Sequence, residues 1–185
     1  MVLAVRIFRL LILLLVGGVS ACASSDLVTG PNLAAASRQP GLSCAPFARV
    51  LSGIALYGEA DTWWMAASGR YERSDRPEIG AVLVLRRSDR LASGHVAVVS
   101  RLLAPRQVLV IQANWVPDEL TEDQLVVDVS PRNDWTEVRM WWPVANTMGG
   151  HVYPAYGFIL PSAPASHETL RRAARPAARL ALNAD

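Results

Sequence analysis

The sequence predicts one compact domain that combines helix and strand within residues 42–161. About 120 residues suffice to bury a single hydrophobic core, and no internal repeat divides them. One segment near residue 44 has apolar residues at helical spacing, and two later runs, beginning at residues 94 and 108, are rich in β-branched residues. We therefore expect a short helix followed by antiparallel strands.

Residues 1–21 have the layout of a signal peptide. Arg6 and Arg9 precede an almost uninterrupted apolar run over residues 10–16, and small residues follow. An uncleaved membrane anchor is the alternative, but the charge-free span is short for a bilayer, which requires about 20 apolar residues. We expect this segment to be removed on export.

Cys22 follows this segment in Val19-Ser20-Ala21-Cys22, a sequence that resembles a bacterial lipobox. The resemblance implies that Cys22 is diacylated on sulfur and becomes the new N-terminus of a lipoprotein. Ala23 stands where an aspartate would favour retention in the inner membrane. The expected location is therefore the outer membrane, with the protein facing the periplasm.

Two further segments flank the predicted domain. Residues 22–41 are rich in Ser, Ala, Gly, Pro and Asn, and they are predicted to form a flexible tether. Residues 162–185 are rich in Ala and Arg, with the helix breaker Pro176 among the arginines. They are predicted to form a mobile, solvated tail, although the arginines could contact lipid phosphates or anionic wall polymers.

The charge balance argues against nucleic acid as a partner. The chain has 18 basic and 16 acidic residues, and loss of Arg6 and Arg9 with the signal peptide makes these numbers equal. No basic stripe with interleaved aromatic residues is present. The three histidines are dispersed and no Cys-x-x-Cys pattern occurs, so neither a metal nor another cofactor is predicted.

A short helix is predicted over residues 44–52. Ser43 can act as its N-cap, Gly53 can end it, and Pro46 is tolerated in the first turn. Cys44 then stands at the helix N-terminus. The residues at helical spacing that are expected to face the core are Phe47, Val50, Leu51 and Ile54.

Cys44 is the candidate nucleophile. It is the one cysteine that lipidation of Cys22 leaves free, and an unpaired thiol in an exported protein favours a chemical role over a disulfide. The positive end of the helix dipole and the free amide hydrogens at this position favour a thiolate and can hold an oxyanion. The alternative is a small buried cysteine that only fills space.

A predicted hairpin carries the candidate base, His95. His95 enters the first strand, and the second strand begins at residue 108. If Ala104-Pro105 is the centre of the turn, opposed residues have numbers that sum to about 209, so His95 faces Asn114. Gln112 shares that face and lies on the diagonal. A one-residue shift of this register would place both amides on the other face.

An imidazole oriented by one of these amides can take the thiol proton and later return it to a leaving amine. A hydrogen-bonded core histidine is the alternative interpretation of His95. His151 is a competing base, because Gly150-His151-Val152 repeats the local pattern. His95 is preferred, since Tyr153-Pro154 interrupts any strand after His151.

Five segments of the body occur in a recognisable order. They are Cys44-Ala45-Pro46-Phe47-Ala48-Arg49, Gly58-Glu59-Ala60 with Trp63-Trp64, Pro77-Glu78-Ile79-Gly80, Gly94-His95-Val96 and Gln112-Ala113-Asn114-Trp115. In order and spacing they resemble the CHAP domain family of cysteine peptidases and amidases, which is related to the NlpC/P60 peptidases. Many members have glutamate where this chain has Gln112, so the resemblance favours Asn114 as the residue that orients His95.

The resemblance implies an α+β, papain-like NlpC/P60 fold in which the N-terminal cysteine helix packs on a small antiparallel β-sheet. It implies a peptidoglycan hydrolase, a cysteine amidase or endopeptidase, in which Cys44 attacks an amide to give a thioester that water resolves. His95 would act as base and then as acid. The rival interpretation is a non-catalytic, lipid-anchored wall-binding or scaffold protein, and a transferase would differ in what intercepts the thioester.

Aromatic residues near these segments are candidates for substrate binding. Tyr57, Trp63 and Trp64 could line a groove for a glycan or stem peptide, and a packed aromatic cluster is the equal alternative. The same two interpretations apply to Trp115, Trp141 and Trp142.

Overall fold

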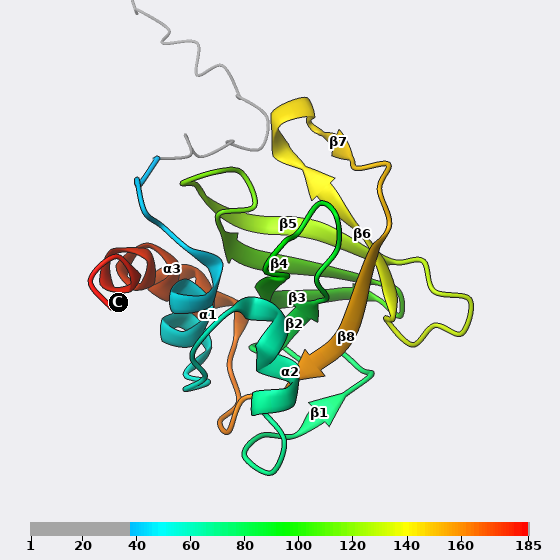
Figure 1. Ribbon diagram of the computed structural model, residues 1–185, viewed down its shortest axis with the longest axis horizontal. Helices are drawn as coiled ribbons and strands as arrows, with labels where there is room; N and C mark the ends of the chain where they lie inside the picture. Colours follow the sequence, from blue (N-terminus) through cyan, green and yellow to red (C-terminus); the bar gives the residue numbers. More distant parts are fainter. Residues whose placement is uncertain (1–37, 185) are drawn as a thin grey trace, which may run out of the picture. The chain divides into compact units, whose positions relative to one another are not determined.

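The computed structural model describes residues 38–184, which contain helices on one side of a curved β-sheet (Figure 1). The helical elements are α1 (Cys44–Ser52), the 3₁₀ turn η1 (Ala60–Thr62), α2 (Trp63–Ala66), the 3₁₀ turn η2 (Pro143–Ala145) and α3 (His167–Ala181). The strands are β1 (Arg73–Ser74), β2 (Val82–Leu85), β3 (His95–Ala104), β4 (Gln107–Ala113), β5 (Leu120–Asp128), β6 (Glu137–Trp142), β7 (Thr147–Met148) and β8 (Tyr153–Ile159).

The sheet is larger than the small antiparallel sheet that was expected, and it closes on itself. Its strand order is β1-β8-β2-β3-β4-β5-β6-β7, and β8 also pairs with β6, so that β2, β3, β4, β5, β6 and β8 complete a barrel. All of these pairings are antiparallel. Closure removes the unpaired strand edges that an open sheet would leave. The predicted mixture of helix and sheet is confirmed, but the size and closure of the sheet are not.

Alternation along the strands divides the apolar residues between two cores. In β2, Leu83 and Leu85 pack inside the barrel, whereas Val82 and Val84 pack under α1 and α3. The same period of two continues in β3, since successive side chains of a strand point to opposite faces. One core therefore fills the barrel, and the other holds the helices against its outer face (Figure 1).

Helix α1 begins and ends where the sequence predicts. Gly53 has a φ of 73°, and its N–H donates to the carbonyl of Arg49, as expected for a residue that ends a helix. Ser43 occupies the N-cap position with extended backbone, but its side chain makes no capping hydrogen bond. Phe47 and Leu51 are buried as expected, so this face anchors Cys44 over the barrel.

The prediction that residues 162–185 form a mobile tail is wrong, because residues 167–181 form the helix α3. The Ser166 side chain caps this helix by accepting a hydrogen bond from the Thr169 N–H, at 3.2 Å. Small apolar residues recur on one face and are buried together with α1: Leu170, Ala174, Ala177, Ala178 and Ala181. This alanine stripe at helical spacing outweighs the disruption that Pro176 causes inside the helix.

The arginines of this segment also have partners on the barrel. Arg171 lies 3.7 Å from Glu122 and 3.6 Å from Asp123, and Arg175 lies 3.7 Å from Glu122. His167 contacts Asp123 at 3.0 Å. These pairs hold α3 against β5, so the arginines are not those of a free tail.

The N-terminal predictions fall mostly outside the described residues. The expected signal peptide, Cys22 and residues 22–37 of the expected tether lie there. Residues 38–41 do not form a flexible tether, since the Gly41 N–H donates to Asp118 Oδ1 at 3.0 Å and the Gln39 N–H donates to the Asp118 carbonyl. Within residues 38–184, no helix has the length and apolar character needed to cross a bilayer.

Candidate active site

The structure brings Cys44 and His95 together where the N-terminus of α1 meets the first residue of β3. Cys44 is partly exposed and is in no disulfide, whereas His95 is 3 % exposed. Two residues that are 51 positions apart in the chain thus lie close enough for the imidazole to change the pKa of the thiol.

Burial raises the pKa of the Cys44 thiol, but other contacts overcome this effect. The charge of His95, a hydrogen bond with its side chain, and backbone hydrogen bonds at Val96 and Cys44 all lower the pKa. The net result is a pKa below the usual value of a cysteine. A lowered pKa increases the thiolate fraction at neutral pH, and the thiolate is the nucleophilic form.

This lowered pKa should be visible in the alkylation of Cys44. A thiol with a lowered pKa loses its proton at lower pH, so the rate of reaction with iodoacetamide should reach half its maximum below the ordinary cysteine pKa. The His95→Ala variant should shift that midpoint upward, because the largest stabilising partner of the thiolate is removed. The measurement is mass spectrometry of the labelled protein across a pH series. A wild-type midpoint at or above that of free cysteine would contradict it.

Gln112 fixes the tautomer of His95. His95 Nε2 lies 2.9 Å from Gln112 Oε1, and both side chains are buried. An amide oxygen only accepts hydrogen bonds, so Nε2 carries the hydrogen and Nδ1 is free to accept the thiol proton. The Gln112 amide nitrogen is buried without a hydrogen-bond partner among the described residues. Gln112 therefore holds the imidazole through one hydrogen bond to a neutral amide.

The expected role of Asn114 as the orienting residue does not fit its position. The predicted strand register is correct in part, since Val98 pairs with Ile111 and Val99 pairs with Val110. However, β4 ends at Ala113, and Asn114 has a φ of 61° and an exposed side chain. Its Oδ1 accepts the Asp118 N–H at 3.0 Å. Asn114 thus shapes the turn into β5, because the extended backbone that the pairing rule assumed has already ended.

Gly94 allows the backbone before His95 to approach its neighbours closely. Its φ is 69°, and a Cβ here would lie 2.6 Å from the Leu85 carbonyl oxygen and 2.8 Å from Asp61 Cβ. Such contacts are shorter than side chains tolerate, and this φ favours glycine. The close packing therefore requires glycine at position 94. This packing positions the imidazole of the next residue, His95, at the start of β3.

One of the comparisons with known proteins gives a match, and it includes this site. Residues 35–114 match the family model of the CHAP domain. This part of the chain is therefore similar to CHAP domains. The match contains Cys44, His95 and Gln112, the three residues that the structure joins. No curated protein and no solved structure matches the chain. A CHAP domain indicates a hydrolase of the amidase or peptidase type that acts on peptidoglycan.

Trp115 contacts His95 just beyond the end of the match. Its ring centroid lies 5.1 Å from that of His95, with an angle of 58° between the planes. The indole Nε1 donates to the Trp141 carbonyl oxygen at 3.1 Å, which fixes the ring. Tyr153 packs edge-on against the other part of Trp115, at 5.1 Å. Trp115 therefore covers the imidazole and limits its access to water.

The other aromatic residues predicted to bind substrate lie elsewhere in the matched region. Trp63 is fully buried in the core, so it cannot contact a substrate. Trp64 stacks on Tyr156 with centroids 5.7 Å apart. Tyr57 is 67 % exposed, and the Arg49 guanidinium lies 4.4 Å from its ring centroid. The packed-cluster alternative is thus correct for Trp63.

A cavity of about 590 Å³ lies on the far side of Trp115. Its walls come from the loop before β3, from β6 and β7, and from the start of β8, and its lining residues are Arg90, Trp115, Met140, Trp142, Thr147, Met148, Gly149, Gly150, His151 and Tyr153. His151 packs against Tyr153 here, at 4.7 Å, and is not among the groups that act on Cys44. Sequence reasoning did not identify Arg90 or Tyr153, because no local pattern connects these separate segments.

Proposed function

We propose that the protein is a lipid-anchored peptidoglycan hydrolase in which Cys44 is the nucleophile and His95 is the general base and acid. The observation that carries this proposal is the buried hydrogen bond from His95 Nε2 to Gln112 Oε1, which leaves Nδ1 for a thiol whose pKa is lowered. The match to the CHAP domain supports the reaction class, which is amide hydrolysis, and the substrate, which is peptidoglycan.

The proposed reaction has two stages. The Cys44 sulfur attacks the amide carbonyl carbon while His95 accepts the thiol proton, and the oxyanion is stabilised by backbone N–H groups at the start of α1. His95 then donates that proton to the leaving nitrogen, and the C–N bond breaks to give a thioester and a free amine. Water attacks the thioester with His95 as base, which releases a carboxylate and restores the thiol.

Gln112 in this proposal is the positioning residue for His95. A neutral amide fixes the ring and its tautomer, but it stabilises an imidazolium less than a carboxylate would. Gln112 therefore contributes the orientation and the tautomer of the imidazole, and it adds no charge beside it.

The test of the function is digestion of purified peptidoglycan by residues 38–185, with the soluble products identified by mass spectrometry. New amine and carboxylate termini at one type of amide bond are the expected result. The masses of the products also distinguish hydrolysis from transfer, because a transferase joins the acyl fragment to another amine. An absence of products, with retained binding to peptidoglycan, would instead favour the non-catalytic wall-binding protein.

We also propose that Cys22 is lipidated and that the protein faces the periplasm from the outer membrane. The support is the lipobox-like sequence before Cys22 and the alanine after it. Two acyl chains give stable membrane anchoring, so Cys22→Ala should move the protein from the membrane fraction to the soluble fraction. Fractionation with immunoblotting measures this shift, and Cys44→Ala is the matched control that should remain in the membrane. Equal membrane association of both variants would contradict the anchor.

A further inference from the structure

We propose that the cavity beyond Trp115 binds the leaving-amine side of the substrate, and that Arg90 there recognises a free carboxylate of that fragment. The inference rests on the proposed hydrolysis by Cys44 and His95. It adds a binding site that lies mostly outside the matched residues 35–114 and that defines the chemistry of one side of the substrate.

Trp115 connects the cavity with the imidazole. It packs against His95 and also lines the cavity, whereas neither His95 nor Cys44 lines it. In a cysteine mechanism the imidazole gives its proton to the leaving nitrogen. The fragment that carries this nitrogen must therefore lie next to His95, and the cavity is one side chain away, beyond Trp115.

The charge of the cavity selects an anion. Arg90 is exposed on a tight turn between β2 and β3, and no carboxylate is found among the described residues that line the cavity. Among residues 38–184, Arg90 takes part in no salt bridge. A guanidinium without an internal partner presents its fork of N–H donors to a carboxylate in a bidentate geometry.

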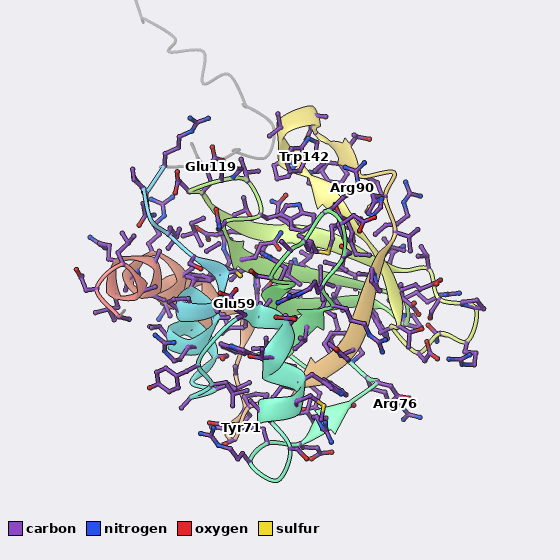
Figure 2. The ribbon with its side chains drawn as sticks, in the orientation of Figure 1. Glu59, Tyr71, Arg76, Arg90, Glu119 and Trp142 are labelled. Carbon is purple, nitrogen blue, oxygen red and sulfur yellow. The ribbon has the colours of Figure 1, made fainter. Side chains whose placement is uncertain are left out.

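Arg90 also acts on groups deeper in the cavity. Burial raises the pKa of the Tyr153 phenol, and the charge of Arg90 opposes that increase. The guanidinium field therefore reaches Tyr153, which itself packs on Trp115. Figure 2 shows Arg90 and Trp142 at the same end of the barrel, and both line the cavity. A carboxylate bound by Arg90 would thus lie beside the aromatic rings of the cavity.

The fragment implied by this arrangement is a short peptide amine with its own carboxylate. Hydrolysis of an amide within a peptide releases an amine that retains a terminal or a side-chain carboxylate. A volume near 590 Å³ is within the range of sites for small ligands and suits a fragment of a few residues. The aromatic walls can pack on its apolar part, while Arg90 fixes its charged end.

The first experiment compares matched substrates in which the amine side carries either a free carboxylate or the corresponding primary amide. For the wild type we expect kcat/KM to favour the acid by about tenfold, as for a charge-assisted hydrogen bond. Arg90→Gln should abolish this preference. Arg76→Gln is the matched control, because Arg76 is an exposed arginine at the opposite end of the barrel (Figure 2) and should keep the preference. Equal preferences in the wild type and in Arg90→Gln would overturn the proposal.

The second experiment measures binding without hydrolysis. In the Cys44→Ala background, tryptophan fluorescence should report binding of the amine-side fragment, weakened about tenfold by amidation of its carboxylate or by Arg90→Gln. Separate amidation of the terminal and of the side-chain carboxylate identifies which one Arg90 binds. The acyl-side fragment should bind independently of Arg90.

These measurements separate the cavity from the hydrolysis. Binding that depends on Arg90, without any hydrolysis by the wild type, would support the site and contradict the proposed function. Hydrolysis by the wild type, together with fragment binding that Arg90→Gln leaves unchanged, would support the proposed function and contradict the site. Acyl-side binding that depends on Arg90 would overturn the assignment of the cavity to the leaving amine.

Discussion

Replacement of Cys44 by alanine is expected to reduce hydrolysis of peptidoglycan by at least about 10⁴-fold, because no other group can form the acyl intermediate. His95→Ala should reduce turnover by a similar factor, since the remaining thiol has neither a base nor a proton donor for the leaving amine. The two residues act as one unit. The double variant should therefore be little slower than either single variant, and the rate of release of soluble fragments measures all three.

His167→Gln is the matched histidine control for these variants. His167 begins α3 and contacts Asp123 of β5, and it is neither a partner of Cys44 nor a lining residue of the cavity. It should retain most of the activity. Circular dichroism establishes that each variant remains folded. Products that persist in both Cys44→Ala and His95→Ala would exclude the proposed mechanism.

Gln112→Ala is expected to slow turnover by about 10- to 100-fold, the loss expected when a hydrogen bond to a charged group is removed. The affected group is His95, whose ring and tautomer are fixed by the Gln112 oxygen 2.9 Å away. Gln112→Glu is the conservative variant, because its carboxylate keeps an acceptor oxygen at this position. It should restore most of the turnover that Gln112→Ala loses, a rescue that a purely structural role would not require.

Asn114→Gly is the paired variant for Gln112→Ala. Glycine tolerates the φ of 61° at this position while removing the side chain that accepts the Asp118 N–H. Turnover should change by only a few fold. The sequence favoured Asn114 over Gln112 as the residue that orients His95, so it implied the reverse order of losses. A larger loss in Asn114→Gly than in Gln112→Ala would mean that Asn114 reaches the imidazole during the reaction.

The parts of the fold that were predicted correctly depend on local signals. Helix α1 was predicted because Ser43, Gly53 and the spacing of apolar residues all lie within eleven positions, 43–53. The β3–β4 pairing followed from the position of the turn. The same rule failed at Asn114 although the register nearby is the predicted one, because β4 ends at Ala113 and Asn114 has a positive φ. Gln112, which remains in the strand, kept the predicted face.

The parts that were missed depend on distant contacts or on composition that misled the prediction. Closure of the barrel requires β8 to pair with both β2 and β6, and no local pattern in β8 indicates two partners. The C-terminal helix was missed because arginines and Pro176 masked its alanine stripe. The cavity beyond Trp115 combines residues from four segments, so it becomes visible only in the folded chain.

The chain order of β8 and α3 has a consequence for when the thiol becomes reactive. These are the last strand and the last helix, yet β8 closes the barrel that carries His95, and α3 buries the face of α1 behind Cys44. An unfinished or truncated chain therefore lacks the surroundings that lower the pKa of the thiol. Such a chain carries an ordinary cysteine, and Cys44 gains its lowered pKa only after residues 153–181 have been synthesised and have folded onto the domain.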